Sequence, residues 1–381
     1  MERREFARRL IAGGAGVALG IGGARETLGR GREIGEREIE GRGGDAGGAG
    51  DRVRLKLGFD NFSVRAWQWK APRLLDYAAE LGVDTVLFSD LHVFESLEES
   101  ALREHKAKAD ALGVEVQIGT GGICPTSARV QRDFGSPRKH LELLIRVAQS
   151  MGSRAARCYL GSMGDREGEG GIYRHIDSTV EVLKKVRSRA LDAGIRLAVE
   201  NHAGDLQAWE LKMLIEEAGT DYVGATVDSG NATWSLEDPV RNLETLAPYC
   251  VSSGIRDSMV WEDGDGARTQ WTALGDGCVD LKSYFELWRR ECPSTPVQLE
   301  IISGGNREFS YLKREFWKVY PRARAEDFAA YLALAKRGKR IPRFQPTPGV
   351  DRDEAVRLYQ KSELEKSVRY AKDVLGIGLR G

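Results

Sequence analysis

The stretch Ala193-Gly194-Ile195-Arg196-Leu197-Ala198-Val199-Glu200-Asn201-His202 contains, in order, the end of a predicted helix, a glycine, a short apolar strand and a carboxylate. A glycine can adopt the left-handed conformation that ends a helix and turns the chain tightly back into a sheet. A carboxylate at the end of an apolar strand is costly to bury unless it is paired, hydrogen-bonded or bound to a ligand. The stretch therefore predicts one helix–strand unit of an α/β fold, with a functional group at its carboxyl end.

The same unit repeats along the chain from Val53 onward. Short apolar strands are predicted at 55–59, 85–89, 115–119, 155–160, 196–200, 223–228, 249–254 and 296–301. Amphipathic helices are predicted between them, at 72–81, 97–112, 137–151, 175–193, 207–218, 239–247 and 281–290. Such strands are typical of a parallel sheet that is buried on both faces. Eight units in about 250 residues favour a (β/α)8 TIM barrel, with an open doubly wound sheet as the alternative.

The N-terminal residues do not follow this rhythm. In residues 1–24 the pair Arg3-Arg4 precedes a short, glycine-rich apolar run, which resembles a twin-arginine export signal. We therefore expect export to the periplasm or another extracytoplasmic compartment, with no stable membrane span after signal cleavage. Residues 25–51 are rich in glycine and charge, as expected for a flexible linker.

The barrel itself is expected to occupy residues 52–320, with its last helix beginning within 309–320. Residues 321–381 contain two further helical segments, 325–337 and 351–375, separated by several prolines. They predict a helical C-terminal extension that packs on the outside of the barrel or contributes to a homo-oligomer.

Composition excludes several classes of partner. The chain has 57 basic and 57 acidic residues and a formal net charge of zero, so it does not indicate nucleic-acid binding. No glycine-rich nucleotide loop follows the first predicted strand. Its five cysteines show no metal-type spacing, and an odd number argues against a fully paired disulfide framework.

Three carboxylates end separate predicted strands: Glu200, Asp228 and Glu300. Because the functional site of such a barrel lies at the C-terminal face of its strands, we expect them to converge on one metal or substrate site. For any one acid taken alone, a salt bridge with an arginine such as Arg157 or Arg256 is the competing interpretation. The same rule of position selects six candidate substrate-binding residues: Asp90, His92, Arg157, His202, Asn231 and Arg256.

The chemistry of these side chains suits a divalent cation. Carboxylate oxygens favour Mg²⁺ or Mn²⁺, and added imidazole shifts the preference toward Mn²⁺, Co²⁺ or Zn²⁺. Such a cation would polarise a bound carbonyl or hydroxyl group and stabilise a developing enediolate. Carboxylates on opposite sides of a substrate could then remove a proton from carbon and return it.

Five stretches resemble the sugar phosphate isomerase/epimerase family, which has xylose isomerase-like (β/α)8 barrels. They are Val199-Glu200-Asn201-His202, Thr226-Val227-Asp228-Ser229-Gly230-Asn231, Gly254-Ile255-Arg256-Asp257, Leu274-Gly275-Asp276-Gly277-Cys278-Val279-Asp280 and Gln298-Leu299-Glu300. The resemblance covers roughly Leu55 to Ile301. It implies a divalent metal held by Glu200, Asp228 and Glu300, with Mn²⁺ or Mg²⁺ ahead of Zn²⁺ or Co²⁺. It also implies that Glu200 and Glu300 are the catalytic acid/base pair.

One position departs from the family pattern. The family usually has a histidine ligand at the start of a His-x-Lys-Asp-like motif, and this chain has Gly254 there. Glycine offers no side-chain ligand, so three outcomes stay open: three carboxylates hold the metal with water, His202 moves in, or metal binding is lost. Asn231 likewise stands where some relatives have a histidine directed toward the substrate.

The leading hypothesis is a metal-dependent isomerase or epimerase that acts on a sugar or keto-sugar as its small-molecule partner. Export favours a free or oxidised sugar over a phosphorylated one. The alternatives are a keto-sugar lyase or deglycosylase that uses the same site, and a metal-less barrel that binds sugar or serves in assembly. A metal-dependent endonuclease of the same fold is disfavoured by the neutral charge and by export.

Two tryptophans and two histidines can be explained by structural roles. Trp67 and Trp69, after the first strand, form either an apolar wall for a sugar ring or packing under a loop. His140 and His175 lie near predicted helix starts, where we expect them at the surface.

Overall fold

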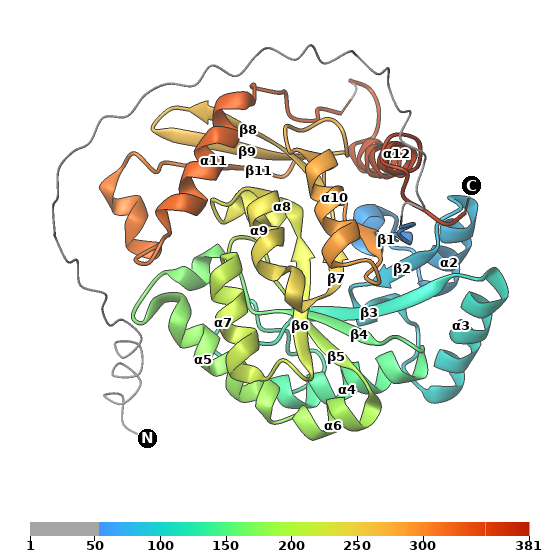
Figure 1. Cartoon of the computed structure of the whole chain (residues 1–381). Coiled ribbons are helices and arrows are strands. Elements are labelled where there is room, and N and C mark those ends of the chain that lie inside the picture. The colour runs from blue at the N-terminus through green and yellow to red at the C-terminus, as the bar shows by residue number, and fades with distance from the viewer. Residues whose placement is uncertain (1–52, 347, 381) are drawn as a thin grey trace, which may run out of the picture. The chain divides into compact units, whose positions relative to one another are not determined.

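Eight short strands pair in parallel in the order β10-β1-β2-β3-β4-β5-β6-β7 (Figure 1). The structure is a computed structural model that describes residues 53–346 and 348–380. The expected export signal, 1–24, and linker, 25–51, lie outside the described residues. The strands are β1 (Leu57–Asp60), β2 (Thr85–Phe88), β3 (Glu115–Gly122), β4 (Ala155–Tyr159), β5 (Arg196–Glu200), β6 (Val223–Asp228), β7 (Cys250–Gly254) and β10 (Val297–Leu299).

The two outer strands of this sheet meet and close it. Ile255, just after β7, forms a parallel bridge with Leu299 of β10. The Ile255 N–H donates to the Gln298 carbonyl at 2.7 Å, and the Glu300 N–H donates to the Ile255 carbonyl at 3.0 Å. The predicted TIM barrel is therefore confirmed, and the open-sheet alternative is wrong.

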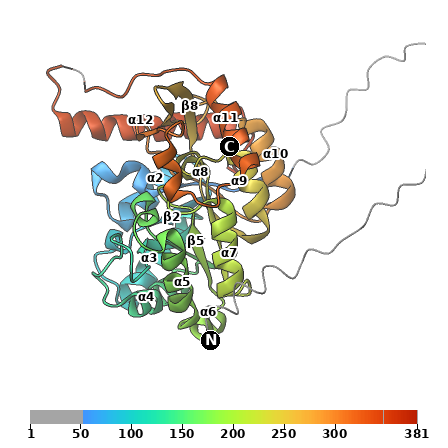
Figure 2. The same cartoon turned by 90° about the vertical axis from the view of Figure 1, so that its left-hand side faces the viewer.

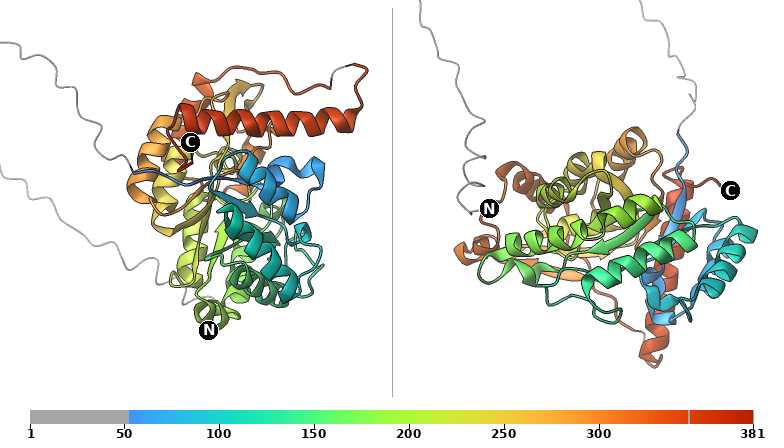
Figure 3. Two further views of the ribbon diagram at one scale, coloured as in Figure 1. Left: turned by 90° about the vertical axis from the view of Figure 1, so that its right-hand side faces the viewer. Right: turned by 90° about the horizontal axis from the view of Figure 1, so that it is seen from below.

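Helices surround the barrel, as the view from below shows (Figure 3, right). Gly113 and Gly194, with φ of 65° and 66°, end α3 and α6 in the left-handed conformation that the sequence predicts. The α-helices around the barrel are α2 (Ala71–Glu80), α3 (Glu99–Leu112), α4 (Pro137–Ser150), α5 (Gly171–Lys184), α6 (Arg187–Ala193), α7 (Ala208–Ala218), α8 (Ser229–Trp234), α9 (Pro239–Leu246) and α10 (Leu281–Glu291). The short 3-10 helices are η1 (Asn61–Trp67), η2 (Leu91–Val93), η3 (Met163–Arg166), η4 (Ala247–Tyr249) and η5 (Arg314–Val319).

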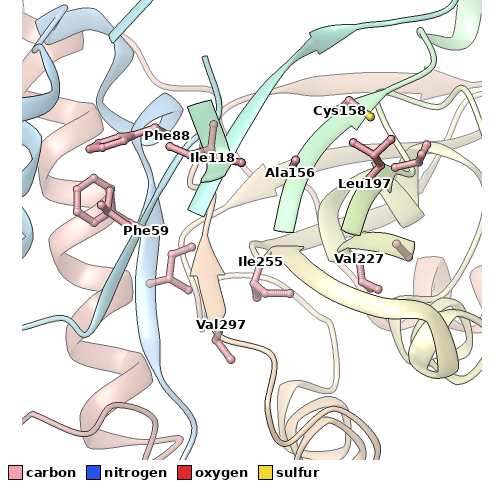
Figure 4. Close-up of a cluster of buried hydrophobic side chains, with 14 of the residues drawn as sticks. Phe59, Phe88, Ile118, Ala156, Cys158, Leu197, Val227, Ile255 and Val297 are labelled. Atoms are coloured by element: carbon pink, nitrogen blue, oxygen red, sulfur yellow. The ribbon is translucent and has the colours of Figure 1, made fainter. Parts of the chain in front are cut away.

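The main hydrophobic core lies between the strands and these helices. Figure 4 shows apolar side chains from successive strands, including Phe59, Ile118, Ala156 and Leu197, and all four are fully buried. Side chains alternate along a strand, so residues next to the core residues face the barrel interior. Arg157 follows Ala156, and this alternation places polar side chains inside the barrel.

A second, smaller sheet stands at one end of the barrel (Figure 2). It is antiparallel, has the order β11-β9-β8, and consists of β8 (Asp257–Asp263), β9 (Gly266–Thr272) and β11 (Asn306–Phe309). The expectation that the last barrel helix begins within 309–320 is wrong, because β11 and η5 occupy this segment. The physical reason is a second hydrophobic cluster, in which Phe309 is fully buried together with Tyr331 of α11 (Ala325–Arg337).

The C-terminal extension is helical, as predicted, and its long helix α12 (Arg352–Asp373) lies across η1 (Figure 3, left). The Ala66 N–H donates to Gln360 Oε1 and the Trp67 indole N–H donates to the Arg357 carbonyl, both at 2.9 Å. Trp67 and Trp69 are in contact, with ring centroids 4.9 Å apart, and both pack against the main hydrophobic core, so these tryptophans serve as packing. No helix in the described part of the chain is long and apolar enough to cross a membrane.

The expectation of surface positions for His140 and His175 is wrong. The two side chains are 0% and 2% exposed. Each ring is buried beside a threonine hydroxyl: His140 Nε2 lies 2.6 Å from Thr120 Oγ1, and His175 Nδ1 lies 2.8 Å from Thr126 Oγ1. Burial of a polar ring is tolerated where it is hydrogen-bonded, and the start of a helix does not exclude it.

Candidate active site at the carboxyl ends of the strands

The three predicted carboxylates lie together at the carboxyl ends of β5, β6 and β10. Glu200 and Asp228 are the last residues of β5 and β6, and Glu300 follows β10 directly. They are 1%, 0% and 5% exposed, and one oxygen from each lies within 4.8 Å of the other two. Three buried acids this close repel one another strongly unless positive charge is present.

One part of that charge comes from Arg157 of β4. Its Nε–H donates to Glu200 Oε2, and its Nη1–H donates to the Thr120 carbonyl at 3.0 Å. Both members of the ion pair are almost fully buried. Arg157 therefore holds the Glu200 carboxylate in one orientation at the end of β5.

The other part comes from Arg256, which directly precedes β8. Its Nη2–H donates to Asp228 Oδ2 and, at 2.5 Å, to Glu300 Oε2. The guanidinium lies against the ring of Trp271 with its carbon 4.3 Å from the ring centroid. Each of the three acids thus forms a salt bridge with an arginine, as the competing interpretation expected, and the three acids also lie together at one site.

Two asparagines position the acids. The Asn231 N–H donates to Asp228 Oδ1 at 2.7 Å, and its side-chain amide donates to Glu200 Oε1 at 3.0 Å. Asn201 exchanges two hydrogen bonds of 2.9 Å with the backbone of Asp228. Asn231, a predicted site residue, therefore contacts the acids, whereas Asn201 was not among the predicted residues.

His202 lies beside the acids without joining them. Its ring stacks on Tyr159, with centroids 3.7 Å apart, and its Nδ1 lies 2.6 Å from the Gly161 carbonyl. A carbonyl only accepts, so Nδ1 carries the proton and Nε2 is left as an acceptor. Burial, reinforced by the charge of Arg157, lowers the pKa of His202 to about 3, so this ring is neutral near pH 7.

Asp90 and His92 lie away from the three acids, at an exposed turn after β2. Their side chains are 47% and 51% exposed and are joined by a contact of 2.7 Å between His92 Nδ1 and Asp90 Oδ1. His92 Nε2 also lies 3.5 Å from Asp133. Their predicted role in binding substrate stays a prediction.

Asp60 is a buried acid that sequence reasoning missed. It ends β1, is 1% exposed, and accepts hydrogen bonds from Ser89 Oγ at 2.5 Å and from the Phe62 N–H at 2.7 Å. Burial, and then the nearby charge of Glu300, raise the pKa of Asp60 to about 7. The signal was present, since Leu57-Gly58-Phe59-Asp60 is another apolar strand that ends in a carboxylate.

The two glutamates differ in their tendency to ionise. Burial raises the pKa of Glu200 to about 7, although Arg157 opposes this shift. Burial alone would also raise the pKa of Glu300, but Arg256 and Arg157 outweigh it and hold that pKa below its usual value. Near neutral pH the site thus contains one ionised glutamate and one that exchanges its proton readily.

The oxygens of Glu200, Asp228 and Glu300 could hold a metal ion, because they are close enough to share one. His202 is not part of this cluster in the described residues. Arg256, however, already donates to two of the three acids, and a divalent ion would compete with it for the same oxygens. With Arg256 in this position the site does not fit a divalent metal.

Comparisons with known proteins agree with this architecture. A 3-oxo-isoapionate decarboxylase from Pectobacterium atrosepticum is 21% identical over 218 residues, which are 57% of this chain and 72% of that protein. A D-psicose 3-epimerase, solved in the presence of D-fructose, superposes with a TM-score of 0.56 at 15% identity and covers 84% of this chain and 100% of its own. The IolI protein, solved with a zinc atom, has a TM-score of 0.50 at 15% identity and covers 74% of this chain and 96% of its own.

At these identities the two solved structures show a shared fold. The sequence profile of the xylose isomerase-like TIM barrel family, in contrast, matches residues 75–313, which are more than half of the chain. This segment begins within α2, ends just after β11 and includes Glu200, Asp228 and Glu300. The chain therefore belongs to the xylose isomerase-like TIM barrel family.

Proposed function

We propose that this protein is an isomerase or epimerase that moves a proton at carbon in a free or oxidised sugar, through an enediolate. The observation that carries the proposal is the pair of buried glutamates, Glu200 and Glu300, each of which is paired with a different arginine. Two carboxylates close to one another can remove a proton from carbon and return it. The likeness to a D-psicose 3-epimerase supports a sugar as the substrate class.

Positive charge is available where the reaction would need it. Removal of a proton next to a carbonyl group places negative charge on the carbonyl oxygen, and donors already aimed at that oxygen stabilise it. Arg256 Nε and Nη1 are buried and have no hydrogen-bond partner among the described residues. These two N–H groups are the donors that we assign to the substrate oxygen.

Flat aromatic side chains border the acids. Tyr159 stacks with His202 on one side, and Trp234 stacks with Trp271 at a centroid distance of 3.6 Å on the other. Such faces suit the apolar C–H face of a sugar. A cavity of about 320 Å³ lies beside the end of β10, and none of the three acids is among its lining residues. Its lining includes Arg65, Ile301, Ser303, Phe344, Tyr359 and Glu363.

A divalent metal is the second candidate for the positive charge of the site. The oxygen ligands would favour Mn²⁺ or Mg²⁺, with Zn²⁺ or Co²⁺ as further choices. It would be held by Glu200, Asp228 and Glu300, and only after Arg256 had left two of these acids.

The proposal is tested by hydrogen exchange at carbon. The protein is incubated in D₂O with D-fructose, D-tagatose, D-psicose and their oxidised derivatives, and deuterium at carbon is measured by NMR. We expect exchange with at least one sugar and a loss of roughly 10²-fold or more in Glu300→Gln, as is usual for a general acid or base. The control is Glu315→Gln, which changes an exposed glutamate of η5 and should leave the rate unaltered. Equal rates in wild type and Glu300→Gln would refute the proposal.

A keto-sugar lyase or deglycosylase is the second candidate function, and the decarboxylase relative favours it. Its product differs in mass from its substrate, whereas an isomer or epimer does not. Mass spectrometry of the product therefore separates the two reactions. Binding of a sugar with neither exchange nor a change in mass would instead favour the sugar-binding or assembly barrel.

We also propose that the chain is exported through the twin-arginine route, on the basis of Arg3-Arg4 and the apolar run that follows. The test is the location of the full chain in cells, compared with an Arg3→Lys/Arg4→Lys variant. We expect the wild type outside the cytoplasm and the variant retained within it. Equal distribution of the two proteins would contradict this proposal.

A further inference from the structure

Gly254 lies against the acid cluster, where a side chain would come too close to two of the carboxylates. A Cβ atom built on Gly254 would lie 2.8 Å from Asp228 Oδ2 and 3.0 Å from Glu300 Oε2. A longer side chain at this position would therefore point between the two carboxylates. In this chain the same two oxygens, Asp228 Oδ2 and Glu300 Oε2, accept hydrogen bonds from Arg256 Nη2 instead.

A second glycine, Gly230, lies against the side chain of Arg256 and makes room for it. A Cβ atom on Gly230 would lie 2.4 Å from Cγ and from Cδ of Arg256, which is closer than such atoms can approach. The Gly230 carbonyl also accepts a hydrogen bond of 2.9 Å from the indole of Trp271, whose ring lies against the guanidinium. Gly230 and Trp271 therefore border the Arg256 side chain, which is 1% exposed.

We propose that the Arg256 guanidinium is the resident cation of this acid cluster, in the place of a divalent metal, and that the protein works without one. Guanidinium stays charged at any ordinary pH and presents several donors in a fixed plane. Two of those donors, Nε and Nη1, are left unpaired inside the protein, where unmade hydrogen bonds are costly. They fit the oxygen atoms of a ligand, and this assignment of the ligand rests on the proposed sugar chemistry.

The electrostatics of the cluster support this role. Glu200, Asp228 and Glu300 face two permanent positive charges, Arg157 and Arg256, and all five side chains are buried. A divalent ion added to this set would meet two cations at close range in a medium of low dielectric constant. It could bind only at the cost of one of the ion pairs.

The first experiment measures metal in the wild-type protein and requires no substrate. The chain is purified without chelator, its bound metals are counted by mass spectrometry, and it is then titrated calorimetrically with Mn²⁺, Mg²⁺ and Zn²⁺. We expect no stoichiometric metal in the purified protein and no saturable binding of these ions to the acids. About one equivalent of metal that is lost in a Glu200→Ala/Glu300→Ala variant would overturn the proposal.

The second experiment removes the arginine. In Arg256→Ala and in Gly254→His/Arg256→Ala the acids lose their partner, and we expect saturable Mn²⁺ binding at least about 10-fold tighter than any binding by wild type, because a like charge at close range repels the ion. The control is Arg268→Ala, which removes an arginine paired with Asp263 and Glu308 and should leave Mn²⁺ binding as in wild type. Folded Arg256→Ala protein with unchanged metal affinity would overturn the proposal.

A variant that keeps the charge covers the case in which Arg256→Ala does not fold. Arg256→Lys should fold and should still bind no metal, and strong Mn²⁺ binding by it would also count against the proposal. Chelator then separates this proposal from the proposed function. Exchange at carbon that survives chelator supports both the role of Arg256 and the proposed isomerase function. Exchange that chelator abolishes refutes only the role of Arg256. Metal-free protein that shows no exchange refutes only the isomerase function.

Discussion

Gly119 of β3 and Arg157 of β4 lie opposite each other in the barrel wall, and the absence of a side chain on the glycine makes room for the arginine. A Cβ atom on Gly119 would lie 3.1 Å from both Cβ and Cδ of Arg157. On its other side Arg157 is in register with Ala198 of β5, which is also small. Small neighbours on both strands thus allow a long charged side chain inside the barrel, where it reaches Glu200.

We predict that Arg157→Met destabilises the protein strongly. It leaves Glu200 buried without its ion pair, and removal of one partner of a buried pair typically costs about 3–5 kcal/mol. Urea unfolding measures the loss. The control is Arg103→Met, which removes an exposed i,i+4 ion pair with Glu99 and should cost no more than about 0.5 kcal/mol. The double variant Arg157→Met/Glu200→Met should recover part of the lost stability, and a loss equal to that of the single change or larger would contradict this explanation.

Gly230→Ala is predicted to destabilise the protein although glycine is a poor helix former. Gly230 lies in α8, where alanine would normally be favoured. The added methyl group would collide with Arg256, and overpacking of this kind costs about 1–3 kcal/mol. Urea unfolding measures the loss. In the control, Gly164→Ala, the nearest atom to the new Cβ is 3.9 Å away, so equal stability of the two variants would show that Arg256 is not tightly held.

We predict a pH-dependent contribution to stability from Glu237. Burial raises the pKa of Glu237 to about 8 from an ordinary value of 4.5, and its carboxyl group accepts from the Ala208 N–H and from Asn242. Because the folded pKa is the higher one, this contribution is complete below about pH 4.5 and is lost as the pH rises through about 8.

The measurement compares wild type with Glu237→Gln, which cannot ionise. The free energy of unfolding of the variant should fall less steeply than that of wild type between about pH 5 and about pH 9. Glu244→Gln, at an exposed position paired with Arg241, is the control and should follow the wild-type curve. Parallel curves for Glu237→Gln and wild type would refute the assignment.

Gln360→Ala is predicted to loosen the contact between α12 and η1. Gln360 Oε1 accepts the Ala66 N–H, and a hydrogen bond of this kind contributes roughly 1 kcal/mol. The Ala66 amide should then exchange with solvent about 5-fold faster, as measured by mass spectrometry of the peptide that contains it. Lys361→Ala, next along the helix, is the control. Unchanged exchange at Ala66 in Gln360→Ala would mean that η1 is held by other contacts.

Much of the barrel was predictable because its signals are local. Short apolar strands and glycines that end helices depend on neighbouring residues, and the eight predicted strands are the eight of the barrel. The convergence of Glu200, Asp228 and Glu300 followed from one rule, that the carboxyl ends of parallel strands meet at one face. Asp60 obeys the same rule and was missed only because the rule was not applied to the first strand.

The small antiparallel sheet was not predictable in the same way. Strands β9 and β11 are distant in the sequence, and their pairing brings Asn306 opposite Gln270. The sheet is stabilised by the cluster around Phe309 and Tyr331, to which α11 contributes. Contacts between such distant segments leave no periodic pattern in the residues from which they are built.

The sequence by itself determined the (β/α)8 architecture and the set of acids at the strand ends, since both depend on local periodicity and on strand direction. Only the tertiary structure decided what those acids contact. An arginine side chain is long and can adopt many rotamers, so its sequence position does not show where its charge lies. The destination of Arg256 was set by Gly230, Trp271 and Glu300, which are far apart in the sequence and meet only in the folded chain.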